Sequence, residues 1–210
     1  MHGPETNGYP LLEWAVAAAP KHGEVESGDR YVVLDEPDGA LVAVVDGLGH
    51  GRPAAMAAQR AVEVLVSHRP DAPVPQLIRS CHDALVETRG VVMSLARFSA
   101  TANTVTWLGV GNVDGHLVRK ERRDSVELLV RNGIVGAHLP TLRTTTAPLA
   151  VGDLLLMTTD GIDPSHDKLT GARGDPANLA GLILSTYGTG ADDALVLVAR
   201  YRRWKPVPVR

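Results

Sequence analysis

Residues 40–51, ALVAVVDGLGHG, are the stretch around which the rest of the sequence is arranged. Residues 41–45 are a run of small and β-branched apolar side chains, which is typical of a strand buried on both faces. The run ends at a carboxylate, Asp46, and three glycines follow within five residues. A buried carboxylate is unfavourable unless a positive charge lies beside it, and glycines let backbone carbonyls approach such a charge. A hard cation with oxygen ligands satisfies both features.

The composition sets outer limits on the function. The chain has 210 residues, which suits one domain with a sizeable core. Its net charge of −3, without a basic face, gives no reason to expect a nucleic-acid partner. No segment is long and apolar enough to span a bilayer, and the N-terminus does not read as a secretory signal, so we expect a cytoplasmic protein without a membrane partner. The single cysteine, Cys81, excludes an internal disulfide and is expected to be inert packing.

The remaining sequence predicts blocks of strands and blocks of helices. Strands are expected over residues 11–19, 30–35, 40–46, 91–99, 104–110, 115–119, 125–130, 153–159 and 194–201. Helices are expected over residues 54–67, 75–88 and 176–187. A turn at residues 37–39 predicts a hairpin, and residues 131–143 form a loop long enough to be a functional flap.

This order of elements indicates the fold class. The blocks do not alternate regularly, which argues against a doubly wound parallel sheet. Two largely antiparallel sheets with helices outside them fit the pattern better. No internal repeat or low-complexity linker divides the chain, so we predict one domain over residues 11–203, with residues 1–10 and 204–210 as tails.

Four acidic residues occur in the same sequence context: each lies at the end of a predicted strand, usually beside glycine. They are Asp29, Asp46, Asp160 and Asp192. The hairpin would bring the first two to the rims of neighbouring strands, and clustered carboxylates need cations or protons because they repel one another. One cysteine and scattered histidines cannot provide a zinc site, whereas oxygen ligands select Mg²⁺ or Mn²⁺. Two such ions about 4 Å apart can share a bridging carboxylate and activate water for attack on phosphorus.

A simpler interpretation of these carboxylates stays open at this point. An aspartate beside glycine at a strand end is commonly a turn residue that hydrogen-bonds its own backbone. Spacing alone does not separate this interpretation from a metal site.

Three motifs together resemble a known family. VVDGLGHG followed by an alanine-rich helix, then GDLLLMTTDGI, then ADDALVLVAR are similar to the metal-dependent serine/threonine protein phosphatases. The closer resemblance is to their bacterial SpoIIE-like branch, which carries D-x-x-G-H-G. The motifs SGDRY, GVGNVDG and NGIVG further resemble the short single-domain phosphatases of stressosome systems. The resemblance runs from about residue 14 to residue 201, and it implies an α+β fold, a four-layer αββα sandwich.

The resemblance also implies roles for individual residues. Asp46 matches the carboxylate that bridges two Mn²⁺ or Mg²⁺ ions, and the backbone carbonyl of Gly47 matches a ligand of one of them. Asp160 and Asp192 match the carboxylates of the other ion, and with Asp46 they form the implied catalytic set. Asp29 matches an acidic residue that usually acts through metal-bound water. The neighbouring Asp193 matches a supporting position.

The implied activity is hydrolysis of phosphoserine or phosphothreonine on regulatory proteins of the stressosome or anti-sigma-antagonist type. Two alternatives stay open: a catalytically inactive phosphatase-fold binding module, and a hydrolase with an aspartyl nucleophile. The second expects D-x-D, but Leu48 stands where the second aspartate is needed. His50 suits a general acid, although we favour a structural role in which it hydrogen-bonds backbone. Arg52 suits binding of a substrate phosphate or a surface position at a helix start.

Overall fold

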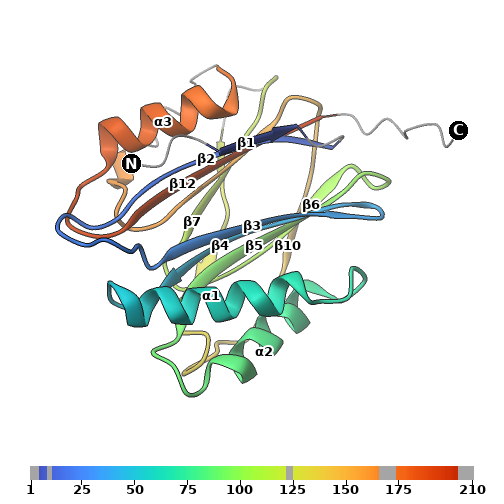
Figure 1. Cartoon of the computed structure of the whole chain (residues 1–210). Coiled ribbons are helices and arrows are strands. Elements are labelled where there is room, and N and C mark those ends of the chain that lie inside the picture. Colours follow the sequence, from blue (N-terminus) through green and yellow to red (C-terminus); the bar gives the residue numbers. More distant parts are fainter. Residues whose placement is uncertain (1–4, 9–10, 122–124, 166–173, 203–210) are drawn as a thin grey trace, which may run out of the picture.

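The computed structural model describes residues 5–8, 11–121, 125–165 and 174–202, and its strands form two sheets (Figure 1). The order in the first sheet is β1 (Glu5–Gly8), β2 (Leu12–Ala19), β12 (Ala194–Tyr201), β11 (Leu154–Thr158), β7 (Asp114–Val118) and β8 (Ser125–Glu127). The order in the second sheet is β10 (Thr145–Pro148), β6 (Thr104–Val110), β5 (Val91–Ser99), β4 (Gly39–Gly47) and β3 (Asp29–Glu36). A short strand, β9 (Val130–Arg131), joins β6 in parallel, and the other pairs of described strands are antiparallel.

The two sheets and the helices form four layers (Figure 1). Helix α3 (Pro176–Tyr187) packs on β2 and β12 of the first sheet. Helices α1 (Arg52–Val66) and α2 (Val74–Leu85) pack on the outer face of the second sheet. The predicted α+β class and four-layer αββα sandwich are therefore confirmed.

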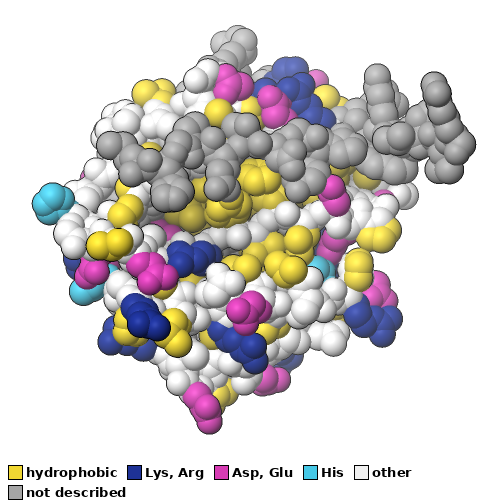
Figure 2. All heavy atoms as spheres, in the orientation of Figure 1, with side chains coloured by type: hydrophobic (Ala, Val, Ile, Leu, Met, Phe, Trp, Pro, Cys, Tyr) yellow, Lys and Arg dark blue, Asp and Glu magenta, His cyan; other side chains and the backbone are white. Residues whose placement is uncertain are grey.

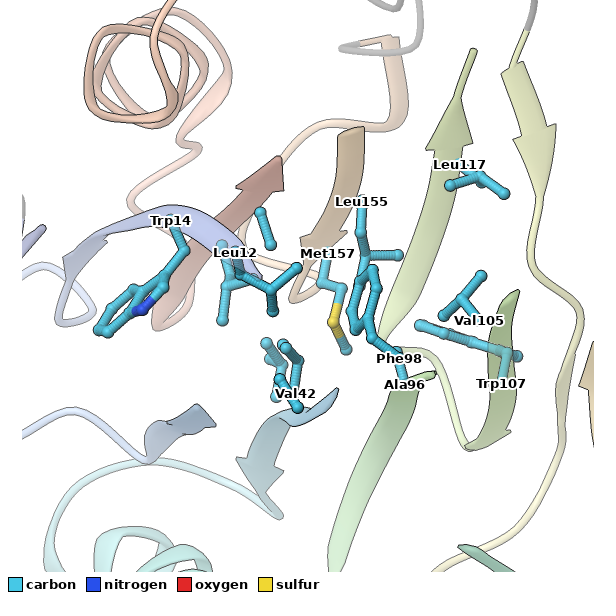
Figure 3. Close-up of a cluster of buried hydrophobic side chains, with 14 of the residues drawn as sticks. Leu12, Trp14, Val42, Ala96, Phe98, Val105, Trp107, Leu117, Leu155 and Met157 are labelled. Carbon is cyan, nitrogen blue, oxygen red and sulfur yellow. The ribbon is translucent and has the colours of Figure 1, made fainter. Parts of the chain in front are cut away.

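Large apolar side chains fill the space between the sheets (Figure 3). Trp107 and Phe98 come from the second sheet and Met157 from the first, and each is at most 1% exposed. Phe98 also stacks on Tyr201, with ring centroids 6.4 Å apart. Full burial of an apolar side chain contributes about 1.5–3 kcal/mol, so this layer holds the sheets face to face.

Strand β4 is apolar throughout because it lies between two cores. Val42 and Val44 face the other sheet, whereas Leu41 and Val45 face α1 and α2. The buried alanines of α1 that let the helix approach the sheet closely are Ala54, Ala55, Ala57, Ala58 and Ala61. Cys81 of α2 lies in the same helix-side core, and burial raises the pKa of its thiol to about 12. Such a thiol is unreactive, as the sequence predicts.

Four segments differ from the prediction. The strand expected over residues 125–130 divides into β8 in the first sheet and β9 beside β6 in the second. Residues 5–8, expected to be part of a tail, form β1 and pair with β2. The loop of residues 131–143 is not a free flap, because Val135 is fully buried and exchanges backbone hydrogen bonds with Val91. Strand β10 has no counterpart in the prediction, since the sequence TTAP is short and does not alternate between apolar and polar residues. The tail expected at residues 204–210 lies outside the described residues.

The face seen in Figure 2 carries charges of both signs. Basic and acidic side chains are interspersed over the layer of α1 and α2, and hydrophobic side chains form a band where the two sheets meet. No single-sign patch gathers on this face, which agrees with the small net charge of −3. In the part of the chain that the structure describes, no helix has the length and apolar character needed to cross a membrane.

Candidate metal centre

At one end of the sandwich, β3 and β4 each carry a carboxylate at a position that faces the other sheet. On β4, Val42 and Val44 face the other sheet, so the period of two places Asp46 on the same face. On β3, Tyr31 and Val33 pack on the same core, which places Asp29 there too. Asp29 and Asp46 are direct partners in the β3–β4 register, as the predicted hairpin requires.

Asp29 is a buried carboxylate with one engaged oxygen. Asp29 is 5% exposed, and Thr159 Oγ1 donates a 2.7 Å hydrogen bond to Asp29 Oδ2. Oδ1 has no hydrogen-bond partner among the described residues. Burial, and then the charge of Asp46, raise the pKa of Asp29 well above its ordinary value, against the opposing hydrogen bond from Thr159.

The pKa of Asp46 reflects the negative charges gathered at this end of the sandwich. Its pKa is raised to about 8, first by burial and then by the negative charges of Asp160, Asp192 and Asp193. Carboxylates that raise one another's pKa in this way gain stability from a cation or a proton between them. The structure thus brings residues far apart in sequence into one electrostatic neighbourhood.

Asp160 and Asp192 each accept a hydrogen bond. Asn112 Nδ2 donates to Asp160 Oδ2 over 2.8 Å, and the backbone N–H of Asp193 donates to Asp192 Oδ1 over 2.9 Å. Within the described ranges, no three His, Cys, Asp or Glu side chains form a group arranged to hold a metal ion. The set of ligands given by the sequence, Asp29, Asp46, Gly47, Asp160 and Asp192, therefore stays a prediction.

Asp193 supports the backbone around these carboxylates. Its Oδ1 accepts from Lys21 N and its Oδ2 from Gly28 N, each over 2.8 Å. Gly28 immediately precedes Asp29, so Asp193 fixes the segment that leads into β3. These contacts are consistent with the prediction that Asp193 holds the backbone around the site and is not itself a metal ligand.

Two glycines of the motifs allow backbone segments to touch. A Cβ on Gly47 would lie 2.1 Å from the carbonyl oxygen of Ala54, at the start of α1. A Cβ on Gly161 would lie 2.1 Å from the carbonyl oxygen of Asp193. Real Cβ atoms do not come this close, so only glycine lets the backbones beside Asp46 and Asp160 approach their neighbours.

We expect Gly161→Ala to destabilise the protein by about 1–3 kcal/mol, because the methyl group must push Asp193 away. Gly181→Ala is the matched control: it lies within α3 with nothing within 4 Å of its Cβ position, and we expect it to stabilise by about 0.5–1 kcal/mol. Urea denaturation measures both changes. Equal shifts of the two midpoints would contradict the close contact at Gly161.

His50 contacts a side chain rather than the backbone. Its Nδ1 lies 2.8 Å from Glu24 Oε1, and both side chains are partly exposed. A side-chain contact thus takes the place of the expected backbone hydrogen bond, and it joins the loop after β4 to the connector between β2 and β3. Arg52 is exposed at the first residue of α1.

Two polar residues at this end were not singled out by the sequence. Asn112, on the turn between β6 and β7, contacts Asp160, and Thr159, directly after β11, contacts Asp29. Both lie inside quoted motifs, GVGNVDG and GDLLLMTTDGI, but neither motif indicates which side chain its polar residue meets. The Asn112–Asp160 contact follows from the pairing of β7 with β11, which puts Asp114 opposite Thr158, and the Thr159–Asp29 contact follows from the stacking of the two sheets.

Comparisons with known proteins place the chain in a family. The profile of stage II sporulation protein E (SpoIIE) matches residues 36–202. No curated protein matches the sequence. A chain from the bacterial stressosome, described as a modular system adapted to control secondary messenger signaling, is 30% identical with a TM-score of 0.82, and the match covers 90% of this chain and 99% of that one.

Two further solved structures share the fold. RsbX in complex with magnesium has a TM-score of 0.84 at 21% identity, covering 94% of this chain and 99% of that one. The catalytic domain of the serine/threonine protein phosphatase PstP, in complex with two manganese ions, has a TM-score of 0.72 at 18% identity, covering 91% and 99%. The chain thus belongs to the SpoIIE family of metal-dependent, PP2C-type serine/threonine protein phosphatases.

Proposed function

We propose that this phosphatase removes phosphate from serine or threonine of regulatory proteins in a partner-switching pathway, of the stressosome or anti-sigma-antagonist type. In this proposal two Mn²⁺ or Mg²⁺ ions are held by Asp29, Asp46, Asp160, Asp192 and the carbonyl of Gly47. The observation that carries it is the state of Asp46, whose pKa is raised to about 8 by burial and by three neighbouring carboxylates. Divalent cations relieve that repulsion.

The donor set suits these metals. Every proposed ligand is an oxygen atom, and oxygen ligands favour Mg²⁺ and Mn²⁺ over zinc or copper. Oδ1 of Asp29 is buried without a partner among the described residues, so it has an unused capacity to bind a cation or its water. The magnesium bound to RsbX and the two manganese ions bound to PstP support the same choice of metal.

The residues of this chain then have distinct tasks in hydrolysis. When bound, the two ions supply an activated water and stabilise charge on the phosphoryl oxygens. Asp46 and Asp29 are held rigidly because they lie on paired strands, and Asn112 orients the carboxylate of Asp160. The contact with Glu24 Oε1 holds the ring of His50 in the loop after β4, which is a structural task.

The class of substrate rests on the relatives. The 30% identical chain belongs to the bacterial stressosome, a modular system that has been adapted to control secondary messenger signaling.

Release of phosphate from a purified phosphoprotein tests the proposal. We expect the full chain to dephosphorylate a serine-phosphorylated anti-sigma-factor antagonist in the presence of Mn²⁺, and to lose this activity in a chelator. A phosphotyrosine peptide serves as the control substrate, on which little turnover is expected. Binding of the phosphoprotein without release of phosphate would instead favour the inactive binding module, and a trapped phosphoenzyme would favour an aspartyl nucleophile.

A further inference from the structure

We propose that Thr159 is a positioning residue that fixes the carboxylate of Asp29 for the cation site, an inference that rests on the proposed function. The contact joins the two sheets. Thr159 follows β11 of the first sheet, and Asp29 begins β3 of the second.

The hydroxyl of Thr159 has a defined direction. Leu195 N donates to Thr159 Oγ1 over 2.8 Å, and Oγ1 in turn donates to Asp29 Oδ2 over 2.7 Å. Because the backbone N–H occupies one lone-pair direction of the oxygen, the hydroxyl proton is free to point at the carboxylate. Thr159 is 2% exposed and Asp29 5% exposed, so bulk water does not compete for this bond.

This bond decides which oxygen of Asp29 is available. Oδ2 is engaged, and Oδ1 is buried without a hydrogen-bond partner within the described part of the chain. A carboxylate held by one oxygen presents the other in a fixed direction, and a hydrogen bond to the charged form also favours ionisation. Partners of this kind typically change metal affinity 10–100-fold when removed.

The hydrogen bonds of this hydroxyl connect the three segments that carry Asp29, Asp160 and Asp193. Thr159 directly precedes Asp160, its donor Leu195 lies two residues after Asp193, and its acceptor is Asp29. Loss of the hydroxyl therefore loosens Asp29 while leaving the proposed ligands themselves intact.

Binding of Mn²⁺ without substrate tests this role. The signal of free Mn²⁺ in electron paramagnetic resonance gives the dissociation constants of the full chain and of Thr159→Val and Thr159→Ser. We expect Thr159→Val to bind Mn²⁺ about 10–100-fold more weakly. Thr159→Ser keeps the hydroxyl, and we expect its affinity to stay within about threefold of that of the unaltered chain, which is less than the roughly 10-fold change expected from loss of such a partner.

Tyr201→Phe is the matched control. Tyr201 is 2% exposed and ends β12 at the opposite end from Asp193, and its hydroxyl donates a 2.8 Å hydrogen bond to Asn103 Oδ1. The variant therefore loses a hydroxyl hydrogen bond of similar length, and we expect its affinity for Mn²⁺ to stay unchanged. Equal weakening of Thr159→Val and Tyr201→Phe would overturn the proposal, because the loss would then reflect general loosening.

The outcomes separate this inference from the proposed function. If the unaltered chain binds Mn²⁺ and Thr159→Val binds it equally well, the positioning role is wrong and the proposed function stands. If the unaltered chain does not bind Mn²⁺, both fail. Should Thr159→Val not fold, Thr159→Ala removes the same hydroxyl, and unfolding of both variants would show that the residue is structural rather than positioning.

Discussion

Asp46→Asn removes metal-dependent phosphatase activity: we expect kcat/KM to fall about 10³-fold, which corresponds to roughly 4 kcal/mol of transition-state stabilisation. The substitution keeps the shape of the side chain and removes the charge shared by the carboxylate cluster. The negative charges of Asp160, Asp192 and Asp193 all raise the pKa of Asp46, so Asp46 lies close to all three carboxylates. Hydrolysis of p-nitrophenyl phosphate with Mn²⁺ measures the effect without a protein substrate.

Asp35→Asn is the control for this loss. Asp35 is an exposed aspartate on β3, and its register partner is Ala40, near the opposite end of the same hairpin from Asp46. We expect this variant to keep the activity of the unaltered protein. If Asp46→Asn also kept it, the carboxylates would not hold a catalytic metal, and the turn-residue interpretation would return.

The parts of the site that the sequence predicts are those set by local rules. The turn at residues 37–39 fixes the register of the β3–β4 hairpin, and that register alone makes Asp29 and Asp46 partners. The buried run that precedes Asp46 predicts a central strand, because its two faces must meet two apolar layers. The layers themselves follow from the order of strand and helix blocks.

The parts that could not be predicted depend on which distant strands pair and on how the sheets stack. Thr159 and Asp29 are 130 residues apart, and Asn112 and Asp160 are 48 apart. Period-two alternation tells which face a side chain takes but not which residue of another sheet it meets. The packing of the loop at residues 131–143 was missed because the burial of Val135 comes from its contacts with α2 and β5 on the helix side of the second sheet, which its own sequence does not indicate.

In the metal-free protein we expect stability to fall as the pH rises from about 4 to about 8. An unfolded aspartate titrates near pH 3.9, whereas burial and the neighbouring carboxylates raise the pKa of folded Asp46 to about 8. Between these values the folded state keeps a proton that the unfolded state has lost, so unfolding releases a proton and higher pH favours it. The free energy of unfolding then falls by about 1.4 kcal/mol per pH unit for each such proton.

Asp46→Asn isolates this contribution, because the amide stays neutral at every pH. In a chelator, urea denaturation from pH 5 to pH 9 should show a shallower decline for the variant, which becomes the more stable protein above pH 7. The difference should level off above about pH 8, where folded Asp46 is ionised as well. Mn²⁺ should reverse the order at high pH, because cations stabilise the folded state that binds them and Asp46→Asn binds them poorly. A stability difference that does not change with pH would show that Asp46 is solvated, with no concentrated negative charge around it for divalent ions to neutralise.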